Sequence, residues 1–96
     1  MSLDEFETSV TADQPPSGMD AALTALWWDA KGDWETAHHT AQSVETPETS
    51  WVHAYLHRKE GNADNASYWY TKCGRKPSQD DLESEWQEIA SALLAV

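Results

Sequence analysis

The chain has 96 residues, with 17 acidic and 6 basic side chains and a formal net charge of −11. This charge argues against nucleic acid and membrane as partners, because both bind clustered lysine and arginine. A chain of this length forms one domain and buries only about two-thirds of its unfolded surface. Its six tryptophans supply the large side chains that such a small core needs, since one aromatic residue buries about 150–250 Å².

The single cysteine and the sequence of the N-terminus bear on cellular location. Cys73 has no partner in the chain for a disulfide bond. The first residues are acidic and lack an apolar run, which predicts no signal peptide. No apolar stretch approaches the ~20 residues that span a bilayer. We therefore expect a cytoplasmic protein.

Residues 1–17 are predicted to form a mobile acidic arm that precedes a helical domain at residues 18–96. The arm carries acidic side chains, no basic one, and the pair Pro15-Pro16, a composition typical of an unpacked terminus. Leu3, Phe6 and Val10 nevertheless have helical spacing. A short helix that docks when a partner is available is therefore the alternative.

Five helices are predicted in the rest of the chain, because apolar side chains recur there at three- and four-residue spacing and no segment alternates as a strand does. Their approximate ranges are 19–30, 34–44, 47–60, 63–73 and 79–94. The residues expected to cap their N-termini are Ser17 or Gly18, Asp33, Thr46, Asn62 and Ser78. Short connections make consecutive helices antiparallel neighbours. We predict an all-α fold of two helix-turn-helix hairpins and a C-terminal capping helix.

An internal repeat relates the first two predicted helices to the next two. With a period of 29 residues, the matched pairs are Ala25 and Ala54, Leu26 and Tyr55, Gly32 and Gly61, Asp33 and Asn62, and Ala37 and Ala66. The segment Gly32-Asp33-Trp34-Glu35-Thr36-Ala37 resembles the Gly-Asp-aromatic-x-x-Ala turn of tetratricopeptide repeats. The segment at residues 66–73 resembles Sel1-like repeats.

This resemblance implies a protein- or peptide-interaction module without catalysis. Its groove would be lined by the first helix of each pair, at Leu26, Asp29, Ala30, Trp51, Tyr55, Arg58 and Lys59. Five of the six basic residues lie between Arg58 and Lys76. A groove that ends in Arg58 and Lys59 would favour an acidic peptide, through charge-assisted hydrogen bonds.

A group of histidines gives the alternative function, a small metal- or ligand-binding protein. His53 and His57 are four residues apart on one helical face, and Glu60 continues that face. His38 and His39 could join them from the preceding helix. Neutral imidazoles bind zinc and other divalent transition metals. The competing interpretation is a set of structural histidines hydrogen-bonded between helices.

Other chemistry has little support in the sequence. It contains no glycine-rich phosphate loop and no recognisable catalytic triad, so we expect no catalytic residues. Cys73 falls at the C-terminal end of a predicted helix, whereas the positive N-terminal end is the one that activates a thiol. We expect it to be a packed thiol.

The aromatic residues outnumber what one small core readily hides. Neighbours such as Trp27 and Trp28, or Trp69 and Tyr70, point to different sides of a helix. They could form an interface, which predicts a homodimer, because tryptophan and tyrosine are enriched at interfaces. Alternatively, they fill the spaces between helix layers.

Overall fold

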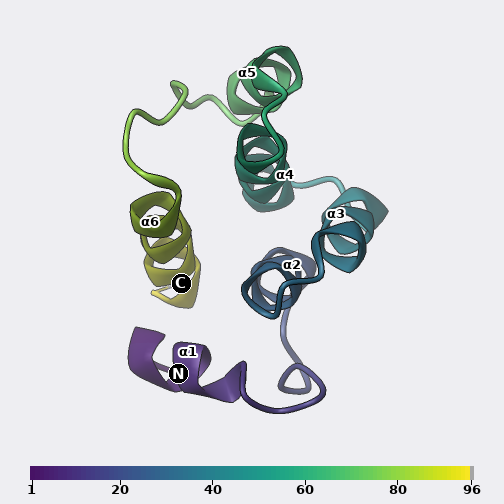
Figure 1. Ribbon diagram of the computed structural model, residues 1–96, viewed down its shortest axis with the longest axis vertical. Helices are drawn as coiled ribbons and strands as arrows, with labels where there is room; N and C mark the ends of the chain where they lie inside the picture. Colours follow the sequence, from purple (N-terminus) through teal and green to yellow (C-terminus); the bar gives the residue numbers. More distant parts are fainter. Residues whose placement is uncertain (96) are drawn as a thin grey trace.

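The computed structural model describes residues 1–95, and in this range it contains α-helices and no β-strand. The predicted all-α class is therefore confirmed. The helices, shown in Figure 1, are α1 (Leu3–Ser9), α2 (Ala21–Ala30), α3 (Trp34–Ser43), α4 (Pro47–Lys59), α5 (Ala63–Lys72) and α6 (Leu82–Leu94). None of the helices in this range is long and apolar enough to cross a membrane.

Helices α2 and α3 lie side by side, as do α4 and α5 (Figure 1). Each pair is joined at a glycine with positive φ, Gly32 at +91° and Gly61 at +89°. Glycine adopts this left-handed conformation without a steric penalty, which is why it ends helices. Asp33 and Asn62 follow directly and cap the next helix, each accepting a hydrogen bond from the backbone N–H three residues on.

Two predicted N-caps are wrong. Helix α2 is capped by Asp20 instead of Ser17 or Gly18, and α6 is capped by Asp81 instead of Ser78. Each aspartate accepts a hydrogen bond from the backbone N–H three residues on, at 2.9 and 2.7 Å. Aspartate caps as well as serine does and adds a negative charge at the positive end of the helix. The α6 helix is consequently shorter than predicted.

Residues 1–17, predicted as a mobile arm, include helix α1, which is packed in the structure. Phe6 is fully buried, and its ring stacks on Trp86 of α6 with centroids 5.6 Å apart. Ser9 Oγ accepts a hydrogen bond from Trp27 Nε1 of α2 at 3.1 Å. Burial of Phe6 offsets the cost of ordering so short a helix. The segment thus lies against residues 18–95 of the predicted domain, whose last residue, Val96, is outside the described residues.

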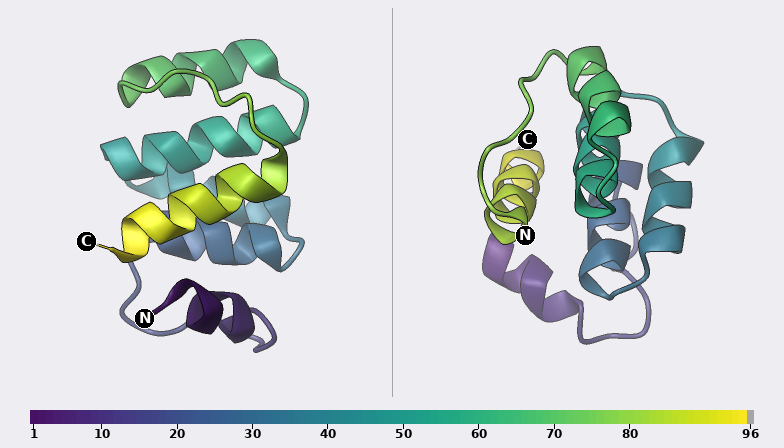
Figure 2. Two further views of the ribbon diagram at one scale, coloured as in Figure 1. Left: turned by 90° about the vertical axis from the view of Figure 1, so that its left-hand side faces the viewer. Right: turned by 45° about the horizontal axis from the view of Figure 1, so that its top comes forward.

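Helix α4 lies at the centre of the molecule (Figure 2). It contacts α3 and α5 as well as α2 and α6. All its residues from Thr49 to His57 are buried. A helix covered on all sides must bury polar as well as apolar side chains, and these polar groups form the two sets described below.

The surplus aromatic residues are mostly packed between helices. Trp27, Trp51 and Trp86 are buried, and Trp28 and Trp69 are half-buried. Among residues 1–95, the aromatic side chain that is mostly exposed is that of Tyr68. Packing between helix layers accounts for these rings without an interface, so a homodimer stays a prediction of the sequence.

Candidate functional site

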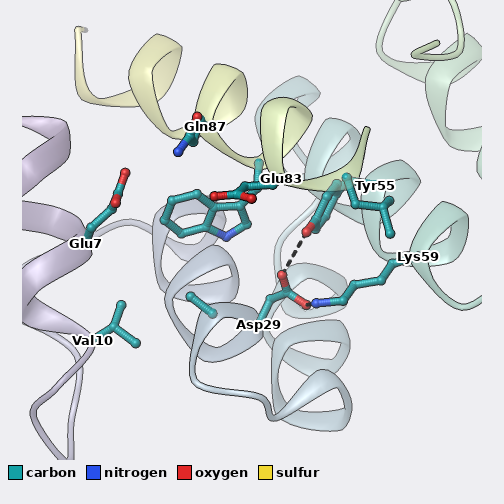
Figure 3. A pocket seen from close by; sticks show the side chains of 10 residues that line it. Glu7, Val10, Asp29, Tyr55, Lys59, Glu83 and Gln87 are labelled. Atoms are coloured by element: carbon teal, nitrogen blue, oxygen red, sulfur yellow. Dashed lines mark hydrogen bonds and ion pairs between the residues drawn. The ribbon is translucent and has the colours of Figure 1, made fainter. Parts of the chain in front are cut away.

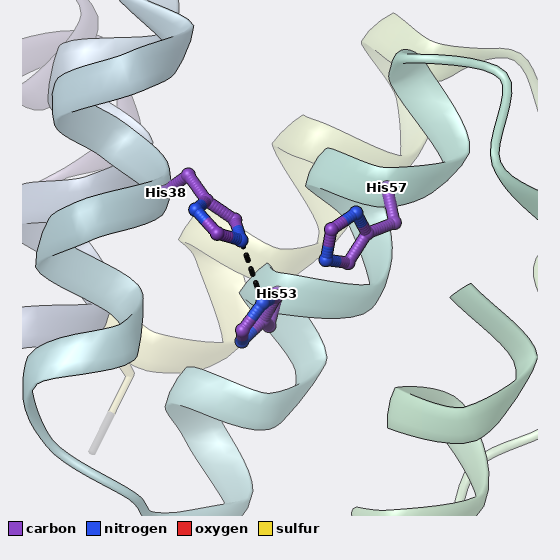
Figure 4. A group of neighbouring side chains, drawn as sticks. All are labelled: His38, His53 and His57. Atoms are coloured by element: carbon purple, nitrogen blue, oxygen red, sulfur yellow. Dashed lines mark hydrogen bonds between the residues drawn. The ribbon is translucent and has the colours of Figure 1, made fainter. Parts of the chain in front are cut away.

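Three histidines converge between α3 and α4 (Figure 4). His53 and His57 project from successive turns of α4, and His38 faces them from α3. Nε2 of His38 and Nε2 of His53 are 3.0 Å apart. One ring nitrogen from each of the three residues lies within 4.8 Å of the other two. His39, the fourth histidine considered in the sequence, is exposed and outside this group.

Two indole rings hold the histidines in place. Trp34, one turn before His38 on α3, stacks on its ring with centroids 4.9 Å apart and an interplanar angle of 7°. Trp34 is itself fixed, because its Nε1 donates a hydrogen bond to the carbonyl of Leu56 at 2.9 Å. From α5, Trp69 stacks on His53 at 3.8 Å. The three imidazoles therefore lie in an environment in which stacking restricts ring rotation.

A carboxylate fixes the tautomer of His57. Its Nδ1 lies 2.6 Å from Oε1 of Glu60, on the next turn of the same helix. A carboxylate can only accept here, so Nδ1 carries a proton, and in the neutral ring Nε2 is then the nitrogen with the lone pair. Histidines that bind metals usually donate their second ring nitrogen to such a group, which orients the ring and makes it more basic. Glu60 thus provides the outer partner that a metal-binding His57 needs.

Burial keeps His53 and His38 in the neutral form near pH 7. Burial, followed by the like charge of His38 and His57, lowers the pKa of His53 to about 4. Burial also lowers the pKa of His38, with His57 as the next cause. In the 3.0 Å contact between His38 and His53 one Nε2 donates and the other accepts. Neutral imidazole is the form that binds a metal.

The dimensions of the cluster suit a tetrahedral metal ion. Zinc binds imidazole nitrogen at 2.0–2.1 Å, which places two ligand nitrogens about 3.3 Å apart. The nitrogens of the cluster lie between 3.0 and 4.8 Å from one another, a range that includes this spacing. Copper, nickel and iron also favour imidazole. Three protein ligands leave the fourth position to water or another ligand.

The opposite side of α4 carries buried polar groups of a different kind. The carboxylate of Asp29, on α2, is 4 % exposed. It accepts hydrogen bonds from the hydroxyl of Tyr55 at 3.1 Å and from Nζ of Lys59 at 2.9 Å. Burial, followed by the charge of Asp29, raises the pKa of Tyr55, which therefore stays protonated. The negative charge of Asp29 is matched by Lys59.

A second buried carboxylate on this side is also bound by a cation and a tyrosine hydroxyl. Glu85 of α6 is 1 % exposed. It accepts hydrogen bonds from Arg58 Nη1 at 2.8 Å and from the hydroxyl of Tyr70 at 2.5 Å. The other terminal nitrogen of Arg58 donates to the carbonyl of Asp80, which fixes the chain before α6. Arg58 is thus engaged within the molecule.

The structure divides the residues predicted to line a peptide groove. Leu26 and Trp51 are buried in the core, and Arg58 is paired with Glu85. The remaining ones line a pocket of about 420 Å³ that α1 and α6 complete, shown in Figure 3: Asp29, Ala30, Tyr55 and Lys59. The sequence predicts α6 as an amphipathic helix, but contains no local signal for where its apolar face binds.

The indoles beside the histidines were not predicted as part of the site. Trp34 could have been found, because it precedes His38 by four residues and such pairs meet on a helix surface. Trp69 comes from another helix, and only the packing of α5 on α4 brings it to His53. Cys73 agrees with a packed thiol, since burial raises its pKa and its Sγ lies 3.3 Å from the carbonyl of Tyr70.

The fold and the site define an all-α protein with a buried three-histidine cluster. Comparison of the chain with models of known families, with curated proteins and with solved structures finds no match. The resemblance to tetratricopeptide repeats remains a prediction from the sequence, and the function must be argued from the sites themselves.

Proposed function

We propose that the protein binds a divalent transition-metal ion, zinc in the first place, through His38, His53 and His57. The observation that carries this proposal is the convergence of three imidazole nitrogens, from two helices, within 4.8 Å of one another. The Nδ1 atom of His57 is held by Glu60, and its Nε2 makes no hydrogen bond with another residue in the range 1–95. A ring oriented in this way through one nitrogen can offer the other nitrogen to a metal ion.

The same geometry gives the ion a structural consequence. His38 belongs to α3, whereas His53 and His57 belong to α4. A bound ion would therefore cross-link the two helix pairs α2–α3 and α4–α5. Because the ligands are neutral, the ion adds positive charge to a protein whose net charge is −11, which favours its binding.

The test is a calorimetric titration of the chelator-treated protein with ZnCl₂. We expect saturable binding of one ion per chain. Replacing His53→Ala removes a ligand and should weaken binding by at least about 100-fold, by analogy with the 10- to 100-fold cost of losing a mere outer partner. His39→Ala, which removes an exposed histidine from the same helix as His38, is the matched control and should bind as the unmodified protein does. Absence of saturable binding, or an equal loss in both variants, contradicts the proposal.

A second candidate function is the binding of a protein or peptide, which the resemblance to helical repeats implies. It is supported by the pocket that contains four residues predicted for this role, Asp29, Ala30, Tyr55 and Lys59. Helices α1 and α6 narrow the expected groove to this pocket, so a single side chain or chain end fits better than an extended peptide. The free thiol of Cys73 suits a cytoplasmic location, which is part of the same proposal.

A further inference from the structure

The pocket on the α2–α6 side of α4 has the dimensions of a small-ligand site. Its volume of about 420 Å³ falls within the usual range of roughly 300–1,000 Å³ for such sites. Four helices contribute to its walls. Part of the lining is apolar, from Val10, which directly follows α1, and from Leu82 and Trp86 of α6. The pocket can therefore hold the apolar part of a ligand as well as a polar group.

The charged residues that line the pocket determine which polar group of a ligand it can bind. Lys59 is the only cationic side chain among its lining residues, and Asp29 neutralises it at 2.9 Å. Two further carboxylates remain, Glu7 from α1 and Glu83 from α6 (Figure 3). Neither side chain makes a hydrogen bond or ion pair with another residue in the range 1–95. The pocket thus has two uncompensated negative charges beside an apolar wall.

We propose that this pocket binds an organic cation, an ammonium or guanidinium group on an apolar stem. The cation would contact Glu7 and Glu83, and the stem would pack on Leu82 and Trp86. Charge-assisted hydrogen bonds and the face of an indole ring both favour such a group. Lys59 is paired with the buried carboxylate of Asp29, so this part of the pocket is already neutral and offers an anion no free positive charge.

The inference rests on the second candidate function, ligand binding in this pocket, but predicts a positively charged ligand instead of an acidic one. The sequence predicted an acidic peptide from Arg58 and Lys59, but both cations are paired with buried carboxylates. An arginine or lysine side chain of a peptide carries the proposed chemistry, and so does a free alkyl amine or guanidine. The metal site plays no part in this inference.

Binding has a consequence for the N-terminal helix. Glu7 belongs to α1 and Glu83 to α6, so a cation held by both joins the two helices. Apart from this, α1 is held by the burial of Phe6, by the hydrogen bond to Ser9 Oγ, and by the hydrogen bonds from Lys31 Nζ to the carbonyls of Val10 and Ala12 that follow it. Occupation of the pocket should therefore slow hydrogen exchange in α1 more than in α3 or α5.

The experiment is a titration followed by NMR chemical shifts of the backbone and indole N–H groups. The probes are butylguanidinium chloride, the blocked tripeptide Ala-Arg-Ala, and the blocked tripeptide Ala-Glu-Ala as the anionic counterpart. Both cationic probes should give saturable shifts confined to α1, α6 and the facing end of α4, with dissociation constants of about 1–10 mM for such small ligands. The anionic probe should give no saturable shift.

Variants locate the cation. Glu7→Gln and Glu83→Gln should each weaken binding about two- to fivefold, the usual effect of losing one exposed charge contact. Glu48→Gln, at an exposed position on α4 outside the pocket, changes the net charge equally and should leave binding unchanged. An equal effect of all three variants would mean general attraction to an acidic protein, and would overturn the proposal.

The remaining outcomes distinguish a failure of the proposed cation binding from a failure of the peptide-binding function on which it rests. Tighter binding of the arginine tripeptide than of butylguanidinium identifies a peptide as the source of the cation, and equal binding identifies a free amine or guanidine. Saturable binding of the glutamate tripeptide alone overturns the inference but supports a peptide-binding function. Absence of saturable binding by every probe contradicts both.

Discussion

The two sides of helix α4 bury polar groups in different ways. On the side facing α2 and α6, two carboxylates, Asp29 and Glu85, are each paired with a cation and a tyrosine hydroxyl. On the side facing α3 and α5, three imidazoles converge, and the ring of His57 is held at Nδ1 by Glu60. Both sets are largely buried, and both are supplied mainly by the same helix.

The difference indicates how a structural polar cluster can be told from a binding site. A buried carboxylate whose charge and hydrogen bonds are satisfied needs nothing further, and its removal disrupts the fold. Three imidazole nitrogens within 4.8 Å of one another, by contrast, are close enough together to share a metal ion. The carboxylate side therefore stabilises the structure, whereas the histidine side is the candidate for binding.

The largest expected effect tests the carboxylate side. Glu85→Ala leaves Arg58 and Tyr70 without their partner and should lower the free energy of unfolding by about 3 kcal/mol. Urea denaturation measures this change. Glu83→Ala, two residues earlier and exposed, should change stability by less than about 0.5 kcal/mol. A similar small effect for both variants would show that the buried pair is not structurally important.

The next effect concerns the histidine side. Zinc at 100 times its dissociation constant should raise the free energy of unfolding by about 2.7 kcal/mol, because it binds the folded protein only. Thermal unfolding with and without ZnCl₂ measures this gain. His53→Ala should lose it, while Glu85→Ala should keep it despite its lower stability. A gain that survives His53→Ala would place the ion elsewhere.

The pH dependence of the metal-free protein gives a third comparison. The folded pKa of His53, about 4, lies below its unfolded value of about 6.5. The neutral form is thus favoured by folding, and this stability is fully present above pH 6.5 and is lost as pH falls towards 4. We expect a loss of up to about 3 kcal/mol in this window, at about 1.4 kcal/mol for each unit of difference in pKa, measured by urea denaturation. His53→Gln should flatten the curve, and an unchanged slope would contradict the burial argument.

The smallest expected effect tests whether Glu60 only orients His57 or binds the ion itself. Glu60→Gln keeps the shape of the side chain but weakens its hold on His57 Nδ1, and should lower zinc affinity about tenfold. Calorimetry measures the change. His38→Ala, which removes a ligand, should cost considerably more. Equal losses in the two variants would mean that Glu60 binds the ion directly.

Much of the fold follows from local signals in the sequence. Glycine followed by aspartate or asparagine marks both helix breaks, at Gly32 and Gly61, and the spacing of His53 and His57 puts both rings on one face. His38 could be added because short connections make neighbouring helices antiparallel. These features depend on residues close in the sequence, where helical geometry fixes which side chains meet.

The features that the sequence did not predict depend on packing between distant segments. The partners of Arg58 and Lys59 come from α6 and α2, so an apparent basic patch is neutralised within the molecule. The docking of α1 requires the ring of Trp86, far along the chain. Nothing in the local pattern of residues 1–17 identifies that surface, because a short amphipathic helix does not specify its partner.

X-ray absorption at the zinc edge, on the protein loaded with one equivalent of ZnCl₂, tests the central claim most directly. The claim predicts a four-coordinate ion with three imidazole nitrogens at about 2.0–2.1 Å, and the same spectrum for His39→Ala. An ion bound by oxygen alone, or by a single imidazole, would show that His38, His53 and His57 do not form a metal site.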